Sequence, residues 1–223
     1  GWLFAVFTAL ATFGIGNMTQ ANAVATIFKS TFNVETWITG LVLMLITGLV
    51  ILGGIKSIGK ATSLLVPFMI VGYVAGGLVV LALNLDKIPH ALGLIFQGAF
   101  SPAAAGGGLA GSTIAAAMRF GIARGVFSNE SGMGSAPIAA AAARTHDPVK
   151  QSLVSMTQTF IDTLVVCSMT ALVILTGTAW QAGVPAGQLT SASFGAVLGQ
   201  PGVLLVALAT ALFAASTLIG WNY

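Results

Sequence analysis

The sequence predicts an all-α, polytopic membrane protein, and three observations lead to this fold class. Of the 223 residues, 57% are hydrophobic and only 6% are charged, whereas soluble domains carry about 25% charged residues. The mean hydropathy is +0.98, and too few charges exist to solvate a soluble surface. Several apolar stretches also have the length of about 20 residues that a helix needs to cross a bilayer. The net charge of +3 is too small to indicate a nucleic-acid partner.

The apolar stretches divide the chain into predicted elements that follow one another with short connections. The first span is interrupted by the polar cluster 16–20, and the piece after 86–89 is amphipathic and expected at the membrane interface. In chain order we expect spans at 1–28, 37–54 and 61–84, the interfacial piece at 88–100, a broken span with arms at 109–126 and 136–144, a span at 149–177, a loop with one or two half-helices at 178–201, and a last span from 202.

The broken span is the most informative feature. Between its arms, residues 127–135 bring Glu130, Asn129 and two glycines into an apolar surrounding, with Arg124 just before them. At about 1.5 Å per residue, the arm 136–144 covers only half a bilayer, which places the interruption near mid-membrane. Irregular backbone and ionisable groups at that depth are typical of a transporter binding site. The alternative is a cytoplasmic loop after a complete helix.

The distribution of basic residues predicts the orientation of the spans. Lysine and arginine gather at the loop after the second span and at the connector after the broken span, where Lys56, Lys60, Arg144 and Lys150 lie. Lys29 and Lys87, on the opposite side, are balanced by Glu35 and Asp86. The first side is therefore expected to be cytoplasmic. The single cysteine, Cys167, excludes an intrachain disulfide.

Four segments carry a resemblance to a known family: GNMTQANAVA (16–25), RGVFSNESGMGSAP (124–137), TFIDTLVVCSMTALVI (159–174) and STLIGWNY (216–223). In this order they resemble the alanine/glycine:cation symporter family. The resemblance implies an inverted-repeat bundle of the leucine-transporter type with a discontinuous sixth helix. On that map, residues 1–223 are one transmembrane domain fragment of about six spans, helices three to eight. The first two helices and the C-terminal helices are then absent.

The function implied by the resemblance is secondary active symport. It implies import of a small neutral amino acid, alanine or glycine, coupled to sodium by alternating access in a multi-pass protein of a prokaryotic cell membrane. Sodium and membrane lipid are then the partners besides the substrate, and no other cofactor and no nucleic acid are expected. Proton coupling and a pore-forming subunit remain alternatives. The sequence offers no nucleophile–base or metal-ligand spacing for an intramembrane enzyme.

Substrate groups are predicted from what a zwitterionic amino acid needs. The break leaves helix carbonyls unpaired, and these can accept hydrogen bonds from the substrate ammonium; they belong to Val126, Phe127, Ser128 and Asn129. The resemblance places the polar contact of the third helix at Gln20, and most carboxylate contacts on the missing first helix. The alternative for Gln20 is a hydrogen bond between helices.

The end of the last span is the second predicted half of the site. Thr217 and Trp221 are four residues apart and share a helix face, so a hydroxyl and a large ring can limit the substrate's size. Ser216 and Thr217 resemble the paired hydroxyls that complete a sodium site in this fold. The alternatives are hydrogen bonds to the helix's own backbone and, for Trp221, an anchor at the interface.

Four ionisable residues lie in or near the membrane region, Arg119, Arg124, Glu130 and Asp162, and a structural network is favoured over direct contact with the substrate. A lone buried charge is costly in this environment, so a partner is the default expectation. The predicted structural network joins Arg124 to Glu130 or to Asp162.

Overall fold

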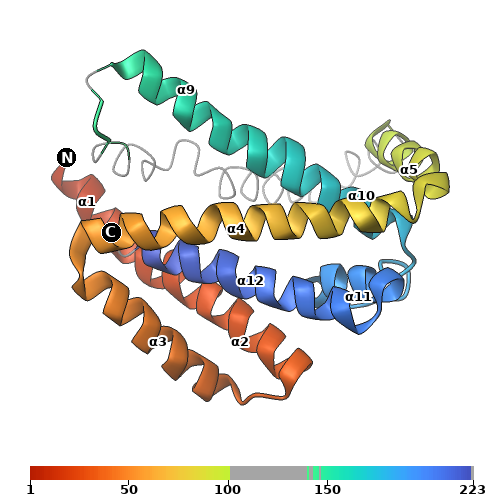
Figure 1. The fold of residues 1–223 in the computed structure, drawn as a ribbon, viewed down its shortest axis with the longest axis horizontal. Coiled ribbons are helices and arrows are strands. Elements are labelled where there is room, and N and C mark those ends of the chain that lie inside the picture. Colours follow the sequence, from red (N-terminus) through yellow and green to blue (C-terminus); the bar gives the residue numbers. More distant parts are fainter. Residues whose placement is uncertain (101–139, 141–142, 146, 222–223) are drawn as a thin grey trace, which may run out of the picture. The chain divides into compact units, whose positions relative to one another are not determined.

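The computed structural model describes residues 1–100, 140, 143–145 and 147–221, and every regular element among them is a helix (Figure 1). The predicted all-α class is confirmed for this part of the chain. In order, the elements are α1 (Trp2–Ala11), the π-helix η1 (Thr12–Met18), α2 (Thr19–Phe32), α3 (Thr36–Leu52), α4 (Gly54–Ala82), the 3-10 turn η2 (Leu85–Lys87), α5 (Ile88–Phe100), α9 (Pro148–Thr159), the π-helix η3 (Phe160–Cys167), α10 (Ser168–Thr176), α11 (Ala186–Leu198) and α12 (Gln200–Trp221).

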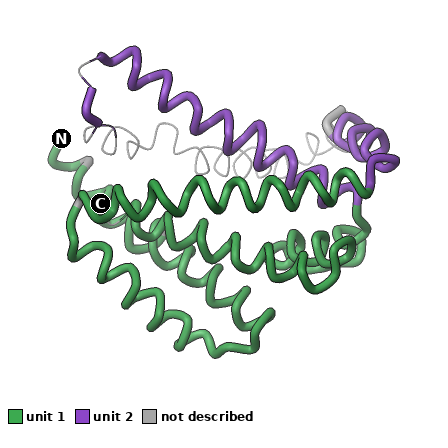
Figure 2. Tube along the Cα trace, in the orientation of Figure 1, with its two compact units in different colours: residues 1–83, 177–223 green, residues 84–176 purple. Residues whose placement is uncertain are grey.

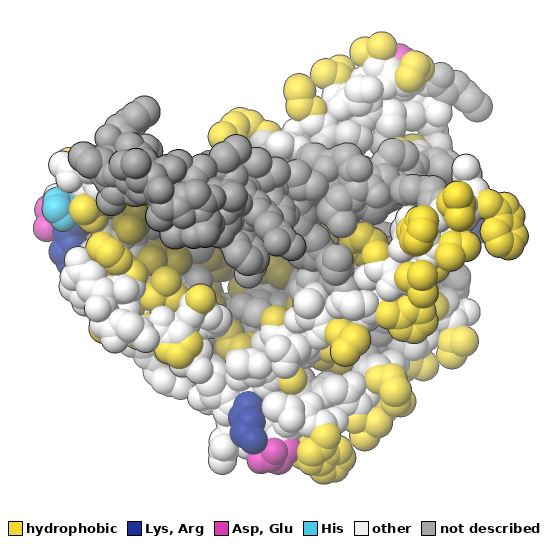
Figure 3. Space-filling view, turned by 180° about the vertical axis from the view of Figure 1, so that it is seen from behind, with side chains coloured by type: hydrophobic (Ala, Val, Ile, Leu, Met, Phe, Trp, Pro, Cys, Tyr) yellow, Lys and Arg dark blue, Asp and Glu magenta, His cyan; other side chains and the backbone are white. Residues whose placement is uncertain are grey.

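Within the described residues, three helices are long and apolar enough to cross a membrane: Lys56–Ala82, Pro148–Thr176 and Gln200–Trp221. Helix α3 is apolar but shorter. In Figure 3, hydrophobic side chains spread widely over the visible surface, while charged side chains appear at only a few places. On α4, Leu64 and Phe68 are 75% and 74% exposed. Such surfaces are stable against lipid, which supports a membrane protein.

The helices form two compact units (Figure 2), and each is described by itself. The first unit comprises Gly1–Leu83 and Gly177–Tyr223. In it, α12 packs against α2, α3, α4 and α11. The ring of Tyr73 on α4 lies 5.6 Å from that of Phe194 on α11 and 5.8 Å from that of Phe213 on α12. Phe194 is fully buried, so this aromatic cluster fixes α11 and α12 against α4.

Short turns reverse the chain within the first unit. Asn33 adopts the left-handed conformation (φ 54°) that ends α2, and its N–H donates to the Lys29 carbonyl at 3.1 Å. Lys29 Nζ lies 3.1 Å from Glu35 Oε2 across this turn. Both side chains are about half exposed, so the pair contributes little stability. Between α11 and α12, Gly199 has φ 66° and ψ −148°, a conformation open essentially to glycine alone.

The second unit comprises Asn84–Thr176. Helices α9, η3 and α10 follow one another without a break. Helix α10 packs on α5, and its buried residues include Met169 and Val173. Asp147 begins α9: its Oδ1 accepts hydrogen bonds from the N–H groups of Val149 (2.9 Å) and Lys150 (3.4 Å), with Pro148 next in the first turn. This is a strong helix start.

The predicted boundaries agree with most elements, with one correction. Lys56 and Lys60 were predicted in a loop, and the span after them from residue 61; both lysines lie in α4, which already begins at Gly54. A single residue, Gly53, separates α3 from α4, and Gly54 takes φ 70° as the first residue of α4. Hydropathy misplaces this boundary because exposed lysines in the first turns of a helix are polar yet helical. The predicted half-helix of 178–201 is the single helix α11.

Candidate functional site

The polar cluster that interrupts the first span changes the type of helix without ending it. From Thr12 to Met18 the chain is π-helical, and the N–H of Thr19 donates to the Gly14 carbonyl, five residues back. Gly16 and Asn17 lie inside this segment, and Gln20 follows it as the second residue of α2. Single π-helical turns inside α-helices are frequent at functional sites. The π-helical segment Thr12–Met18, and the residues packed against it, are therefore a candidate site in the first unit.

Helix α12 brings Trp221 directly onto this π-helical segment. A β-carbon built on Gly16 would lie 2.7 Å from Cγ, 2.9 Å from Cβ and 3.0 Å from Cδ2 of Trp221. Gly16 is buried, and Trp221 is half-buried. Two of the segments quoted for the family resemblance, far apart in the sequence, thus meet in the structure. Sequence reasoning identified both segments but not their contact.

The two hydroxyls predicted to hold sodium lie on the same helix, close to this contact. Ser216 Oγ and Thr217 Oγ1 both donate to the Phe213 carbonyl, at 2.8 and 3.0 Å. Ser216 Oγ also lies 3.9 Å from the sulfur of Met69 on α4. The backbone bonding that was the alternative for these residues is therefore present. It engages the hydroxyl protons and leaves oxygen lone pairs, so it is compatible with a role as ion ligands.

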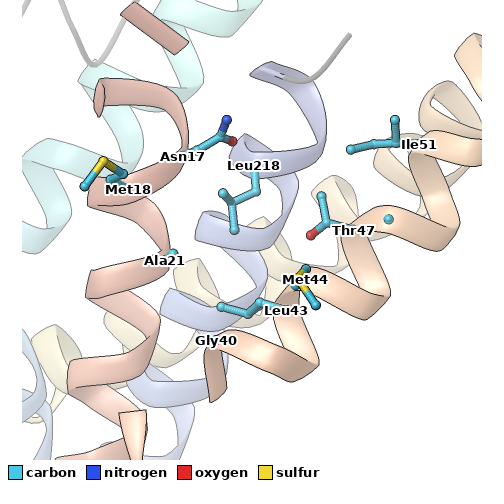
Figure 4. Close-up of a pocket in the computed structure, with 10 residues that line it drawn as sticks. Asn17, Met18, Ala21, Gly40, Leu43, Met44, Thr47, Ile51 and Leu218 are labelled. Carbon is cyan, nitrogen blue, oxygen red and sulfur yellow. The ribbon is translucent and has the colours of Figure 1, made fainter. Parts of the chain in front are cut away.

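A groove of about 430 Å³ lies between η1, α2, α3 and α12 (Figure 4). Asn17, Met18 and Ala21 line one side, residues of α3 from Gly40 to Ile51 line the other, and Leu218 lies between them. The lining is mostly apolar, with the Asn17 amide and the Thr47 hydroxyl as its polar side-chain groups. Gln20, Thr217 and Trp221 are not among the described residues that line it.

Several predicted site residues fall outside the described residues. These are the residues of the broken span and its charges: Arg124, Val126, Phe127, Ser128, Asn129 and Glu130. Asp162, the third member of the predicted charge network, lies half-buried in the π-helix η3 of the second unit. There, Ser168 Oγ donates to the Thr163 carbonyl five residues back, at 3.1 Å. The network itself stays a prediction.

Three features are typical of a membrane transporter. The helices are long and apolar, a π-helical interruption carries polar residues, and the end of α12, with Ser216, Thr217 and Trp221, packs against that interruption. The family model of the sodium:alanine symporter family matches residues 1–223. The chain belongs to this family, which is a family of transporters and not of enzymes. The family membership predicted from the sequence is confirmed.

Curated relatives agree with this assignment. The sodium/alanine symporter AgcS of Methanococcus maripaludis is 51% identical over all of this chain and 49% of its own length. The probable sodium/glutamine symporter GlnT of Bacillus subtilis is 38% identical over all of the chain and 46% of its own length. The sodium/proton-dependent alanine carrier protein of Bacillus sp. PS3 is 38% identical over 70% of the chain and 34% of its own length. The chain spans about half the length of the curated relatives it matches.

Proposed function

We propose that this chain forms the central part of a symporter that imports a small neutral amino acid, alanine or glycine, together with sodium by alternating access. The proposal rests on the family and on the names of relatives that mention sodium and alanine. It places the protein in the cell membrane of a bacterium or archaeon, the sources of those relatives, as a multi-pass protein surrounded by lipid. The leucine-transporter-type arrangement of inverted repeats is part of this proposal.

The structural observation that supports the proposal is the contact between Trp221 and the π-helical segment at Gly16. It brings a large ring of α12, one turn after Thr217, against a segment that carries Asn17 and is followed by Gln20 on α2. In the proposed mechanism, the ring of Trp221 limits the size of the substrate side chain. Gln20 offers a neutral donor and acceptor, while the carbonyls of residues 126–129 receive the ammonium.

Sodium is proposed to bind at the hydroxyls of Ser216 and Thr217. Neutral hydroxyl and carbonyl oxygens suit a monovalent cation that must be released again on each cycle. Because Thr217 lies beside Ser216 and one turn before Trp221, it can link occupation of the ion site to occupation of the amino-acid site. Linked sites change each other's affinity by the same factor, which is how ion binding drives substrate uptake.

Two alternatives lead to different measurements. Proton coupling is favoured by the names of two relatives, each called sodium/proton-dependent. A pore would let alanine cross the membrane without coupling to an ion gradient. The complete protein, reconstituted in liposomes, separates them by uptake of labelled alanine under an inward sodium gradient, an inward proton gradient without sodium, or neither. Concentrative uptake under the sodium gradient alone is expected. Uptake under the proton gradient alone supports the first alternative, and equilibration without either gradient supports the pore.

A further inference from the structure

The close approach at Gly16 depends on the absence of a side chain. The atoms of Trp221 that a β-carbon at position 16 would meet are Cγ, Cβ and Cδ2, at 2.7–3.0 Å. Carbon atoms in favourable contact are about 3.5–4.0 Å apart. Turning the indole about χ1 can move Cγ and Cδ2, but Cβ is fixed to the backbone of α12, so the 2.9 Å approach to Cβ stays whatever the rotamer. A methyl group at position 16 would instead displace the end of α12 by about 1 Å.

Neighbouring glycines show that this contact is local. Gly14 lies in the same π-helical segment, and a β-carbon there would meet none of the described residues within 4 Å. Gly220 immediately precedes Trp221 on α12, and the same holds, within the part of the chain that the structure describes, for a β-carbon at that position. Both are exposed, whereas Gly16 is buried. The spacing between the two helices is therefore set at position 16 and not by the other two glycines.

The direction of the helices relates this contact to the proposed amino-acid site. Residue 16 opposes the last residue of α12, and α12 also packs along α2, so the two helices run antiparallel (Figure 1). Gln20 lies one turn after Gly16, and Thr217 lies one turn before Trp221. Antiparallel packing brings Gln20 and Thr217 to about the same level along the two helices. The separation at Gly16 thus controls the separation of these proposed substrate groups.

We infer that Gly16 is a specificity-determining positioning residue: it lets Trp221 seat against the helix backbone and so sets the largest amino-acid side chain that the site accepts. A side chain at position 16 separates α12 from α2 and widens the space between them. Larger amino acids then gain access, and alanine loses contact with its wall. The inference rests on the proposed function, since Gly16 acts on the substrate through Trp221.

The functional test compares Gly16→Ala with Gly14→Ala and Gly220→Ala in the complete protein in liposomes. Inhibition of labelled alanine uptake is measured with unlabelled alanine and with 2-aminobutyrate, which is one methylene larger. One methylene in a tight pocket is worth about 10–200-fold in discrimination. We expect Gly16→Ala to lower the preference for alanine by about tenfold, with both controls unchanged. Merely impaired folding would reduce uptake of both amino acids and leave the ratio intact, and an unchanged ratio overturns the inference.

A second test measures the contact itself and does not require Gly16→Ala to fold. Cysteines replace Gly16 and Trp221 in a Cys167→Ser background, which removes the exposed native thiol. The β-carbons at positions 16 and 221 would start 2.9 Å apart, and a disulfide joins β-carbons about 3.5–4.5 Å apart. A displacement of about 1 Å brings the pair into that range, so it is expected to cross-link under mild oxidation, while Gly14→Cys with Trp221→Cys is not. Absence of the Gly16–Trp221 cross-link would contradict the contact. Absence of alanine uptake by the unaltered protein would instead overturn the proposed function, with cross-linking unaffected.

Discussion

Replacing Thr217 by valine removes one oxygen from the proposed sodium site and keeps the shape of the side chain. Thr217 is half-buried, and its Oγ1 already donates its proton to the Phe213 carbonyl oxygen, 3.0 Å away. Only the oxygen lone pairs are therefore available to an ion. Losing one ligand in a dry site costs about 1–3 kcal/mol, which corresponds to about 5- to 150-fold in affinity. We expect the sodium concentration for half-maximal uptake to rise by a factor in this range.

The assay is sodium-dependent uptake of labelled alanine by the complete protein in liposomes, with sodium and alanine each titrated. Because the two ligands are coupled, the alanine affinity should fall together with the sodium affinity. Thr62→Val on α4 is a matched control, since its half-buried hydroxyl also donates to a carbonyl four residues back, that of Ile58 at 2.9 Å. If Thr217→Val keeps wild-type affinities for both ligands, the hydroxyl serves only the helix backbone, and the proposed ion site is misplaced.

Three further predictions concern other parts of the chain. Trp221→Phe should admit amino acids larger than alanine in competition assays while leaving the sodium dependence nearly unchanged; unchanged size selectivity would remove Trp221 from the site. Cysteines in place of the exposed Lys56 or Arg144, in a Cys167→Ser background, should react with an impermeant thiol reagent only from the cytoplasmic face, and labelling from outside would reverse the predicted topology. Asp147→Ala removes the cap of α9 and should lower stability by about 1 kcal/mol, seen as a lower Tm, whereas Asp147→Ser should retain most of it.

The sequence predicts the helices well because apolar stretches of membrane length have few other solutions. The spans expected at 37–54 and 149–177 correspond to Thr36–Leu52 and Pro148–Thr176, and the interfacial piece to Ile88–Phe100. The boundary at Lys56 was wrong because hydropathy registers polarity and not backbone conformation. A π-helix leaves no hydropathy signal either, so the cluster at Gly16 indicated an interruption but not its geometry.

The candidate site could be predicted only as separate segments. The family motifs identify Gln20, Ser216, Thr217 and Trp221, and helical periodicity places the last two on one face. The contact of Trp221 with Gly16 joins residues about two hundred positions apart, so local sequence patterns carry no information about it. A glycine beside polar residues is the signal that could have indicated a close approach. The broken span, with residues 126–129, stays a prediction, because it lies outside the described residues.

The position of a bound amino acid tests the central claim most directly. A structure of the complete protein determined with alanine and sodium should place the alanine methyl group within about 4 Å of the Trp221 ring, with the ammonium toward the carbonyls of residues 126–129. Density for the ion is expected beside the hydroxyls of Ser216 and Thr217. Alanine bound in the groove between α2, α3 and α12, or at any place without contact to Trp221, would contradict the account.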